Sequence, residues 1–195
     1  MNVKCFLSTI STNKIKLGLL RTQEFLKFCE NPEKNYPIIQ VVGTNGKGST
    51  AAIIAKILQT AQYKVGLFTS PHLYKANERI RINGIPISDA QIKIFIKKYQ
   101  KYIKKYSPTF FETITCMAFW YFNKKKANIA VMETGLGGRL DSVSACIPKL
   151  IVFTKIAKDH TEILGDTLKK ITIEKAGAIK KHSVCVSSPQ TQTVK

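Results

Sequence analysis

The sequence contains no apolar run long enough to cross a bilayer, and its first residues lack the sustained apolar centre that a secretory signal requires. It also contains no CxxC pair. Its five cysteines are widely spaced, as expected of thiols that stay reduced in a cytoplasm. The three histidines stand at unrelated spacings, which argues against a zinc site. We therefore expect a cytoplasmic protein with no membrane partner.

Acidic residues are scarce, 12 against 31 basic ones, and the formal net charge is +19. Such a charge suggests a nucleic-acid partner. The lysines are nevertheless spread over the whole chain, and only four basic residues are arginine. The densest basic stretch, 89–106, has apolar residues on one helical stripe and lysines on the other, which indicates a solvated surface helix. We expect no nucleic-acid partner; strongly salt-dependent binding of duplex or RNA would support that alternative instead.

With 195 residues, the chain can form one domain with at most an appendage. Short apolar segments without alternation are typical of strands buried on both faces, and stretches with helical periodicity separate them here. This order predicts an α/β fold with a mostly parallel sheet and helices on both faces. Strands are predicted at 38–42, 64–70, 128–134, 150–156 and 184–187, and helices at 14–29, 49–62, 89–106, 110–125 and 166–181.

Two smaller predictions concern chain breaks. Asp166 is the candidate N-cap of the last helix. Segment 71–87, which contains Pro, Asn and Gly, is predicted to be a long loop with a small extended piece. After the last strand the sequence stops where a parallel sheet ordinarily continues through a crossover helix. We therefore expect residues 1–195 to form a domain that is incomplete at its C-terminal end.

The segment "VVGTNGKGST", residues 41–50, places three glycines, a lysine and three hydroxyl residues at the junction of a predicted strand and a predicted helix. Glycines let backbone N–H groups point at phosphate oxygens, Lys47 adds a positive charge, and the helix N-terminus adds a partial one. The spacing is shorter than in the common GxxxxGK[ST] loop. A tight turn without a ligand is the alternative, and the combination of residues favours a phosphate-binding loop.

Polar residues follow three of the predicted strands. Ser70 and Glu133 stand at two strand ends, and Asp159 and His160 come after a third. The carboxyl ends of parallel strands open onto one crevice. Each residue alone is a weak signal, since a single histidine after a strand more often makes a structural hydrogen bond. Together they predict a Mg²⁺ site beside the phosphates, because Mg²⁺ prefers oxygen ligands.

With these residues in place, the sequence resembles the folylpolyglutamate synthase/dihydrofolate synthase family of the Mur-ligase group. The resemblance covers nearly the whole chain in the family's order, and the combination of its motifs is specific. The matching segments are "LGLLR", "VVGTNGKGST", "KVGLFTSPHL", "ERIRING", "FFETITCMAFWYF", "METGLGGRLD" and "KDHTEILGDTLKKITIEKAGAIK".

The resemblance implies a P-loop domain of the Mur-ligase central type and an ATP-dependent amide ligase. ATP would phosphorylate a carboxylate of dihydropteroate or of a folate, and the amine of L-glutamate would attack the acyl phosphate. The implied cofactors are ATP and Mg²⁺. The implied phosphate-binding residues are Thr44, Asn45, Gly46, Lys47, Gly48 and Ser49, and the implied metal ligands are Ser70, Glu133 and His160.

The resemblance also implies catalytic roles for Lys47, His160 and Lys175. Lys175 matches a lysine that the family carbamylates; carbamate formation requires a neutral amine, so burial should lower the pKa of this lysine. Without the resemblance, Lys175 would be one more surface lysine. The implied acceptor-binding residues are Leu17, Gly18, Leu19, Phe111, Glu112, Leu140 and Asp141, whose apolar members would otherwise be ordinary core.

The sequence departs from the family in two places. Ser142, Val143 and Ser144 replace the usual Ala-Thr-Asn, which affects the acceptor-side loop. Family members also continue into a C-terminal, glutamate-binding domain that is absent here. A non-catalytic fragment that at most binds ATP and Mg²⁺ is therefore the alternative, and a separately encoded C-terminal half is a candidate partner. Whether dihydropteroate, a folate or both is the acceptor stays open.

Overall fold

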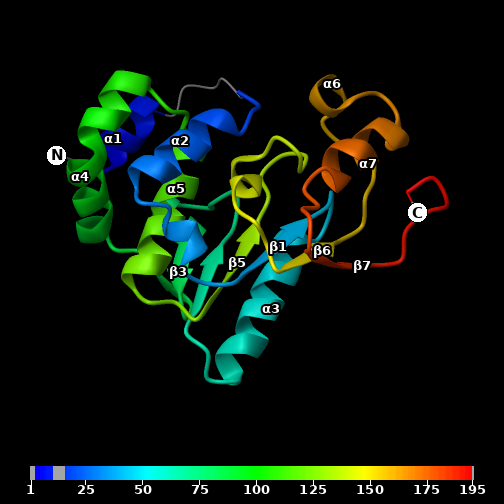
Figure 1. Ribbon diagram of the computed structural model, residues 1–195, viewed down its shortest axis with the longest axis horizontal. Helices are drawn as coiled ribbons and strands as arrows, with labels where there is room; N and C mark the ends of the chain where they lie inside the picture. The colour runs from blue at the N-terminus through cyan, green and yellow to red at the C-terminus, as the bar shows by residue number, and fades with distance from the viewer. Residues whose placement is uncertain (1–2, 11–15, 195) are drawn as a thin grey trace.

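The computed structural model describes residues 3–10 and 16–194. The strands form one seven-stranded sheet in the order β4-β3-β2-β5-β1-β6-β7, with helices on both faces (Figure 1). Strands β1, β2, β5, β6 and β7 run parallel, which confirms the predicted fold class. The strands are β1 (Ile38–Val42), β2 (Val65–Phe68), β3 (Ile80–Ile82), β4 (Ile85–Pro86), β5 (Ile129–Glu133), β6 (Leu150–Phe153) and β7 (Val184–Ser187).

Seven α-helices occur in the described residues, with three short 3₁₀ segments between them. The helices are α1 (Val3–Ile10), α2 (Leu20–Phe28), α3 (Lys47–Thr60), α4 (Asp89–Tyr106), α5 (Phe110–Lys124), α6 (Thr161–Leu164) and α7 (Leu168–Ala176). The 3₁₀ segments are η1 (Pro32–Lys34), η2 (Ala76–Arg79) and η3 (Ser142–Ala145).

Three predicted helix starts are wrong. The helix expected at 49–62 begins two residues earlier, at Lys47. The helix expected from Lys14 begins at Leu20, because Gly18 has φ +132° and ends any helical path before it; residues 14 and 15 lie outside the described part. The last helix is capped by Thr167, whose Oγ1 accepts from the N–H of Lys170 at 3.2 Å. Asp166, the predicted N-cap, instead pairs with the Lys170 ammonium at 2.9 Å.

The predicted loop 71–87 contains the antiparallel hairpin of β3 and β4, which extends the sheet beyond β2. Asn83 and Gly84 connect its strands with φ of 48° and 81°. Positive φ at both central residues is the signature of the tight hairpin turn that Asn-Gly favours. The small extended piece expected there is thus a hairpin that returns the chain to the end of β2.

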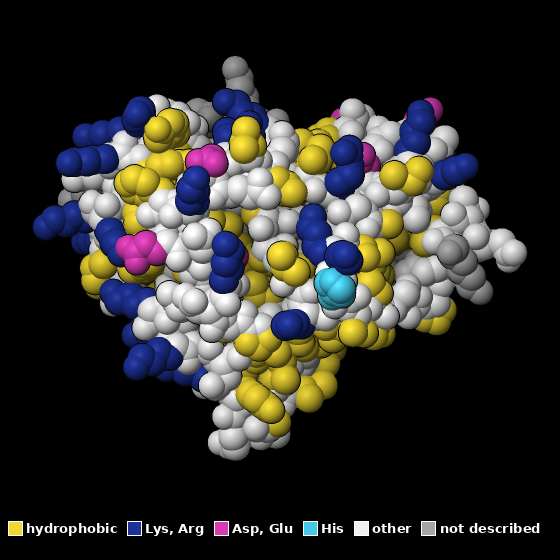
Figure 2. All heavy atoms as spheres, viewed as in Figure 1, with side chains coloured by type: hydrophobic (Ala, Val, Ile, Leu, Met, Phe, Trp, Pro, Cys, Tyr) yellow, Lys and Arg dark blue, Asp and Glu magenta, His cyan; other side chains and the backbone are white. Residues whose placement is uncertain are grey.

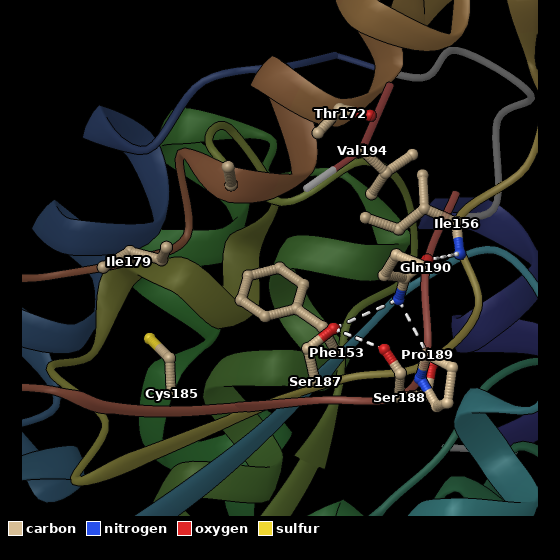
Figure 3. A pocket seen from close by; sticks show the side chains of 11 residues that line it. Phe153, Ile156, Thr172, Ile179, Cys185, Ser187, Ser188, Pro189, Gln190 and Val194 are labelled. Carbon is tan, nitrogen blue, oxygen red and sulfur yellow. Dashed lines mark hydrogen bonds between the residues drawn. The ribbon is translucent and has the colours of Figure 1, made fainter. Parts of the chain in front are cut away.

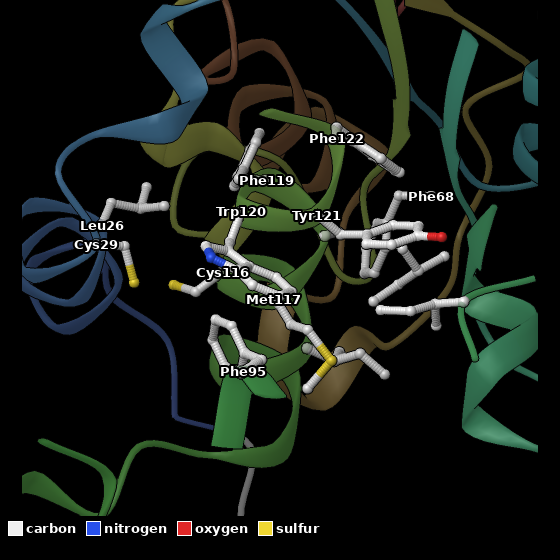
Figure 4. Close-up of a cluster of buried hydrophobic side chains, with 14 of the residues drawn as sticks. Leu26, Cys29, Phe68, Phe95, Cys116, Met117, Phe119, Trp120, Tyr121 and Phe122 are labelled. Carbon is white, nitrogen blue, oxygen red and sulfur yellow. The ribbon is translucent and has the colours of Figure 1, made fainter. Parts of the chain in front are cut away.

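Helices cover the two faces of the sheet unequally. On one face, α3 packs on Ile39 and Val41 through Ala51 and Ala55. On the other, α5 lies under α2 and α4 in a cluster rich in aromatic rings (Figure 4). The stretch 89–106 is the amphipathic surface helix that was predicted, with its apolar side buried in this cluster. Helix α7 covers β6 on the same face.

Strand β7 forms one edge of the sheet and is exposed along its length. Val184 and Val186 pair in register with Leu150 and Val152 of β6, yet their exposures are 62% and 53%. Parallel strands are normally covered on both faces. This end of the sheet therefore presents an uncovered apolar strip beside α3. No helix in the described residues is long and apolar enough to span a membrane.

Candidate nucleotide and acceptor site

The glycine-rich loop joins β1 to α3 and is held by the segment that follows β6. The N–H of Thr44 donates to the carbonyl of Lys155 at 2.9 Å, and its hydroxyl bonds both the carbonyl and the N–H of Ala157. A side chain at Gly43 would collide with that of Thr154. The loop can therefore approach β6 closely only because residue 43 is glycine.

The start of α3 offers its backbone donors to solvent. Gly46 precedes the helix with φ +80°, and Thr50 is the first residue whose N–H returns to a helical carbonyl, that of Gly46 at 2.9 Å. The N–H groups before it are the ones that a helix leaves without acceptors. Lys47 folds back so that Nζ donates to the carbonyl of Thr44 at 3.1 Å. Asn45, Gly46 and Ser49 are exposed, so this end of α3 is open to an anion.

Two of the predicted metal ligands meet beside this loop. The N–H of Ser70, after β2, donates to Oε2 of Glu133, the last residue of β5, at 2.9 Å. Glu133 is 3% exposed, and burial raises the pKa of its carboxyl, against the lowering effects of the Ser70 N–H and the charge of Lys47. A Cβ at Gly48 would lie 3.3 Å from Oε2, so the carboxylate lies directly against the loop.

This donor set fits Mg²⁺. A hydroxyl and one buried carboxylate are hard oxygen ligands, and Mg²⁺ commonly uses one or two carboxylates together with phosphate oxygens and water. No group of three or more His, Cys, Asp or Glu side chains that could hold a metal occurs in residues 3–10 and 16–194. A metal here would therefore depend on the phosphates for part of its coordination.

His160, the third predicted ligand, lies at the N-terminus of α6 with φ +48°. Its ring nitrogens stand 3.7 Å from an oxygen of Asp159 and 3.8 Å from one of Glu162, and its side chain is 47% exposed. The structure records no contact between His160 and the Ser70–Glu133 pair. Its predicted metal role stays a prediction.

Lys175 of α7 is only 3% exposed, so it is not the ordinary surface lysine that its sequence position alone suggested. Nζ donates to the carbonyl of Gly43 at 2.8 Å, which joins α7 to the glycine-rich loop. Burial, and after it the charge of Lys47, lowers the pKa of Lys175 from 10.5 to about 8. The predicted direction of this shift is confirmed.

The predicted acceptor residues come from three segments that touch one another. The N–H of Gly18 donates to the carbonyl of Leu140 at 3.2 Å, and Leu17, Leu19 and Leu140 are half-buried. The half-buried ring of Phe111 packs so closely on Gly135 that a Cβ there would lie 2.5 Å from the ring.

Two buried carboxylates hold this region together. Glu112 accepts from Arg21 Nε and from the N–H of Thr109, both at 2.7 Å. Asp141 accepts from three backbone N–H groups of its own loop, at 2.8 to 3.0 Å. Burial raises the pKa of Asp141 to about 6 despite these bonds. Both carboxylates therefore already have partners within the protein.

Sequence reasoning missed two features of this site. Thr109 and Glu112 form a capping box at the start of α5, which the spacing "TFFE" signals. Arg79 and His72, in the loop after β2, are hydrogen-bonded at 2.8 Å near Phe110. Only the concentration of arginines in the matching segments of a lysine-rich chain hinted at them.

A hollow of about 620 Å³ lies elsewhere, between α7, the end of β6 and residues 185–194 (Figure 3). Its lining is mainly apolar, and Gln190 closes one side by bonding the N–H of Ile156 and the carbonyl of Thr154. None of the predicted site residues lines it, so this hollow is separate from the glycine-rich loop.

Residues 41–185 match the Mur ligase middle domain, and the chain belongs to the Mur ligase family. Within it, the chain resembles the folylpolyglutamate/dihydrofolate synthases. It is 44% identical over 173 residues to the dihydrofolate synthase/folylpolyglutamate synthase of Bacillus subtilis. The aligned region covers 85% of this chain and 40% of that relative.

Solved structures of proteins from this group also match the chain closely. The structure of E. coli FolC in complex with DHPP and ADP matches with a TM-score of 0.90 and 33% identity, over 96% of this chain and 46% of that one. Mycobacterium tuberculosis folylpolyglutamate synthase complexed with ADP matches with a TM-score of 0.88 and 32% identity, over 98% and 45%. The chain thus spans less than half the length of each of these relatives.

Proposed function

We propose that this chain is the ATP-binding portion of an amide ligase that adds L-glutamate to dihydropteroate or a folate. One observation carries the proposal: the buried carboxylate of Glu133, bonded to Ser70, lies against Gly48 of an open helix N-terminus. The N–H groups that would bind the phosphates are thereby adjacent to the oxygen atoms that would bind Mg²⁺, as phosphoryl transfer requires. The relatives' nucleotide and DHPP complexes support the same assignment.

In the proposed reaction, an acceptor carboxylate oxygen attacks the γ-phosphorus of ATP and ADP leaves. The glutamate amine then attacks the acyl carbon, loses a proton, and inorganic phosphate leaves. Thr44, Asn45, Gly46, Lys47, Gly48 and Ser49 would hold the phosphates through backbone donors and the Lys47 ammonium. Bound Mg²⁺, on Ser70, Glu133 and, as predicted, His160, would supply charge neutralisation at the transferring group.

Lys175 has the properties that carbamylation requires. Its amine has a pKa of about 8, so a usable fraction is neutral near physiological pH, and it points to the carbonyl of Gly43 in the loop. A carbamate there would replace a buried cation with an anion beside Lys47. The acceptor would lie against Leu17, Gly18, Leu19, Phe111, Glu112, Leu140 and Asp141.

We further propose that residues 1–195 act as one ATP-binding domain in the cytoplasm and that glutamate is bound by a polypeptide beyond them, in the same protein or separately encoded. The exposed β7 edge supports this arrangement, because a further strand and helix would cover it. The same observation favours a second candidate, in which the chain binds nucleotide without ligation.

Calorimetric titration with a non-hydrolysable ATP analogue, with and without Mg²⁺, tests the nucleotide site. We expect Mg²⁺-dependent binding, lost in Lys47→Ala and kept in Lys56→Ala, which removes an exposed lysine of the same helix. Binding that survives Lys47→Ala would contradict the proposal. ADP release on adding dihydropteroate and glutamate then separates ligation from nucleotide binding alone. We expect this release to require the polypeptide that binds glutamate.

A further inference from the structure

Arg79 lies between the segment of Ser70, a candidate metal ligand, and that of Phe111, a candidate acceptor-binding residue. It is the last residue of η2, and its carbonyl accepts from the N–H of Thr69, the neighbour of Ser70. Its guanidinium carbon stands 5.2 Å from the ring centre of Phe110, the first residue of α5 and the neighbour of Phe111.

The guanidinium of Arg79 is held in place without a direct ion pair, although the charge of the buried Glu133 carboxylate acts on it from nearby. Nε donates to Nδ1 of His72 at 2.8 Å, which fixes the plane of the group. No hydrogen-bond or ion-pair partner in residues 3–10 and 16–194 is recorded for its two terminal nitrogens. Arg21 and Arg139, by contrast, each pair with a glutamate. Arg79 is also half-buried: burial lowers the pKa of its guanidinium, and the charge of Glu133 partly opposes that lowering.

The loop that carries this pair is itself well ordered by hydrogen bonds. The carboxylate of Glu78 accepts from the N–H groups of Leu73, Tyr74 and Lys75 at 2.8 to 3.0 Å. Glu78 is thereby committed to the turn and is not the counter-ion of Arg79. The two terminal nitrogens of the guanidinium form a planar donor group that can make bidentate hydrogen bonds to a carboxylate.

We propose that the two terminal nitrogens of Arg79 bind the carboxylate of the pterin-type acceptor and present it to the γ-phosphate, with His72 as the positioning residue. This inference rests on the proposed ligase function. We favour a carboxylate over a phosphate as the ligand of Arg79, because the loop at Gly43–Ser49 is already the proposed binding site for the phosphates. In the proposed reaction, the part of the acceptor that must reach the metal-binding residues is its reacting carboxylate.

Calorimetry with pteroate and with its carboxamide tests this role, using the chain with Mg²⁺ and a non-hydrolysable ATP analogue. We expect the wild type to prefer pteroate over the carboxamide by about 10- to 100-fold, the range for charged hydrogen bonds. Arg79→Met should abolish the preference, and Arg79→Lys should restore only part of it. Arg81→Met is the matched control and should keep the preference, since within the described part of the chain the Arg81 side chain bonds the carbonyl of Glu78 and no other group.

A cooperative thermal unfolding transition and retained nucleotide binding, both expected of the Arg79 variants, establish that the variants are folded. Equal pteroate affinity in wild type and Arg79→Met would overturn the inference, and so would a wild type that does not prefer pteroate over its carboxamide. In both cases, retained nucleotide binding would still support the ligase proposal. Nucleotide binding without pteroate binding overturns the inference as well. Loss of nucleotide binding in the wild type would instead defeat the proposed function itself.

Discussion

Lys175 is a cation buried against the carbonyl of Gly43, and burial opposes its charge. Its pKa falls from 10.5 to about 8, so the unfolded chain binds more protons than the folded one between these values. Stability must therefore rise with pH through this window. Below the folded pKa the lysine is charged in both states, and the cost of burying the charge is present in full.

We predict that the wild type gains about 2 kcal/mol of unfolding free energy relative to Lys175→Met when the pH is raised from 7 to 9.5. Urea unfolding in CO₂-free buffer at the two pH values measures it. Bicarbonate should stabilise only the wild type, because Met cannot form a carbamate. Parallel pH dependence of the two proteins would show that Lys175 is not buried as described.

Glu112 combines a structural role with a proposed one. Thr109→Ala removes its capping partner and should lower the unfolding free energy by about 1 kcal/mol. Glu112→Gln weakens the pair with Arg21 and should cost a similar amount, since Arg21 is 40% exposed and its charge is screened. If the carboxylate contacts the pterin, Glu112→Gln should also weaken pteroate binding, measured by calorimetry, by more than Thr109→Ala does. Equal losses would leave Glu112 a capping residue only.

Individual residues also show how far a sequence can be interpreted. Ser70 and Glu133 could be predicted to meet because parallel strands end at one edge. The hydrogen bond of Lys175 to Gly43 could not, because it joins residues 132 positions apart, and only the resemblance singled out this lysine. The roles of Arg79 and His72 depend on the path of a hairpin whose geometry no periodicity describes.

At Gly48, just after the junction of β1 and α3, the residue that best stabilises the helix is not the one that best fits the position of Glu133. Alanine at residue 48 favours the helix by up to about 1 kcal/mol over glycine. Its Cβ would also stand 3.3 Å from Glu133 Oε2 and displace the carboxylate. We predict that Gly48→Ala leaves the melting temperature unchanged or raised while Mg²⁺-dependent nucleotide affinity falls about tenfold, a loss near 1.4 kcal/mol.

Gly46→Ala provides the comparison for this prediction. Residue 46 has φ +80° and open space around its Cβ, so alanine there strains the backbone without touching Glu133. It should lower the melting temperature, which Gly48→Ala should not. Unaltered Mg²⁺-dependent affinity in Gly48→Ala would mean that Glu133 can move without consequence.

The strands of the sheet were predictable because each is a short apolar run between breaks, whereas element ends were not. Leu20 starts α2 because Gly18 has a conformation that no periodicity reveals. Thr167 caps α7 although the adjacent Asp166 is an equally good capping residue, and the choice depends on the path of the chain after α6. The hairpin at Asn83–Gly84 carried a readable signal that the Pro and Gly content obscured.

The whole molecule combines a formal charge of +19 with an exposed edge strand, β7. Exposed hydrophobic side chains gather over α3 in the lower part of Figure 2. Ile53 and Ile57 of this helix are both largely exposed. Val184 and Val186 continue the apolar surface on the α3 side of β7. Charge repulsion opposes self-association, and added salt weakens that repulsion. Edge pairing should therefore increase with ionic strength.

We predict that Val186→Glu suppresses the salt-induced self-association of the chain and changes its unfolding free energy by less than about 0.5 kcal/mol, because the side chain is 53% exposed. Ile151→Ala, in the adjacent strand and fully buried, should cost about 2 to 5 kcal/mol without this protection. Analytical ultracentrifugation at low and high salt, with urea unfolding, measures both effects. Self-association that persists in Val186→Glu would assign the contact to α3 instead, since its exposed isoleucines form the neighbouring apolar surface.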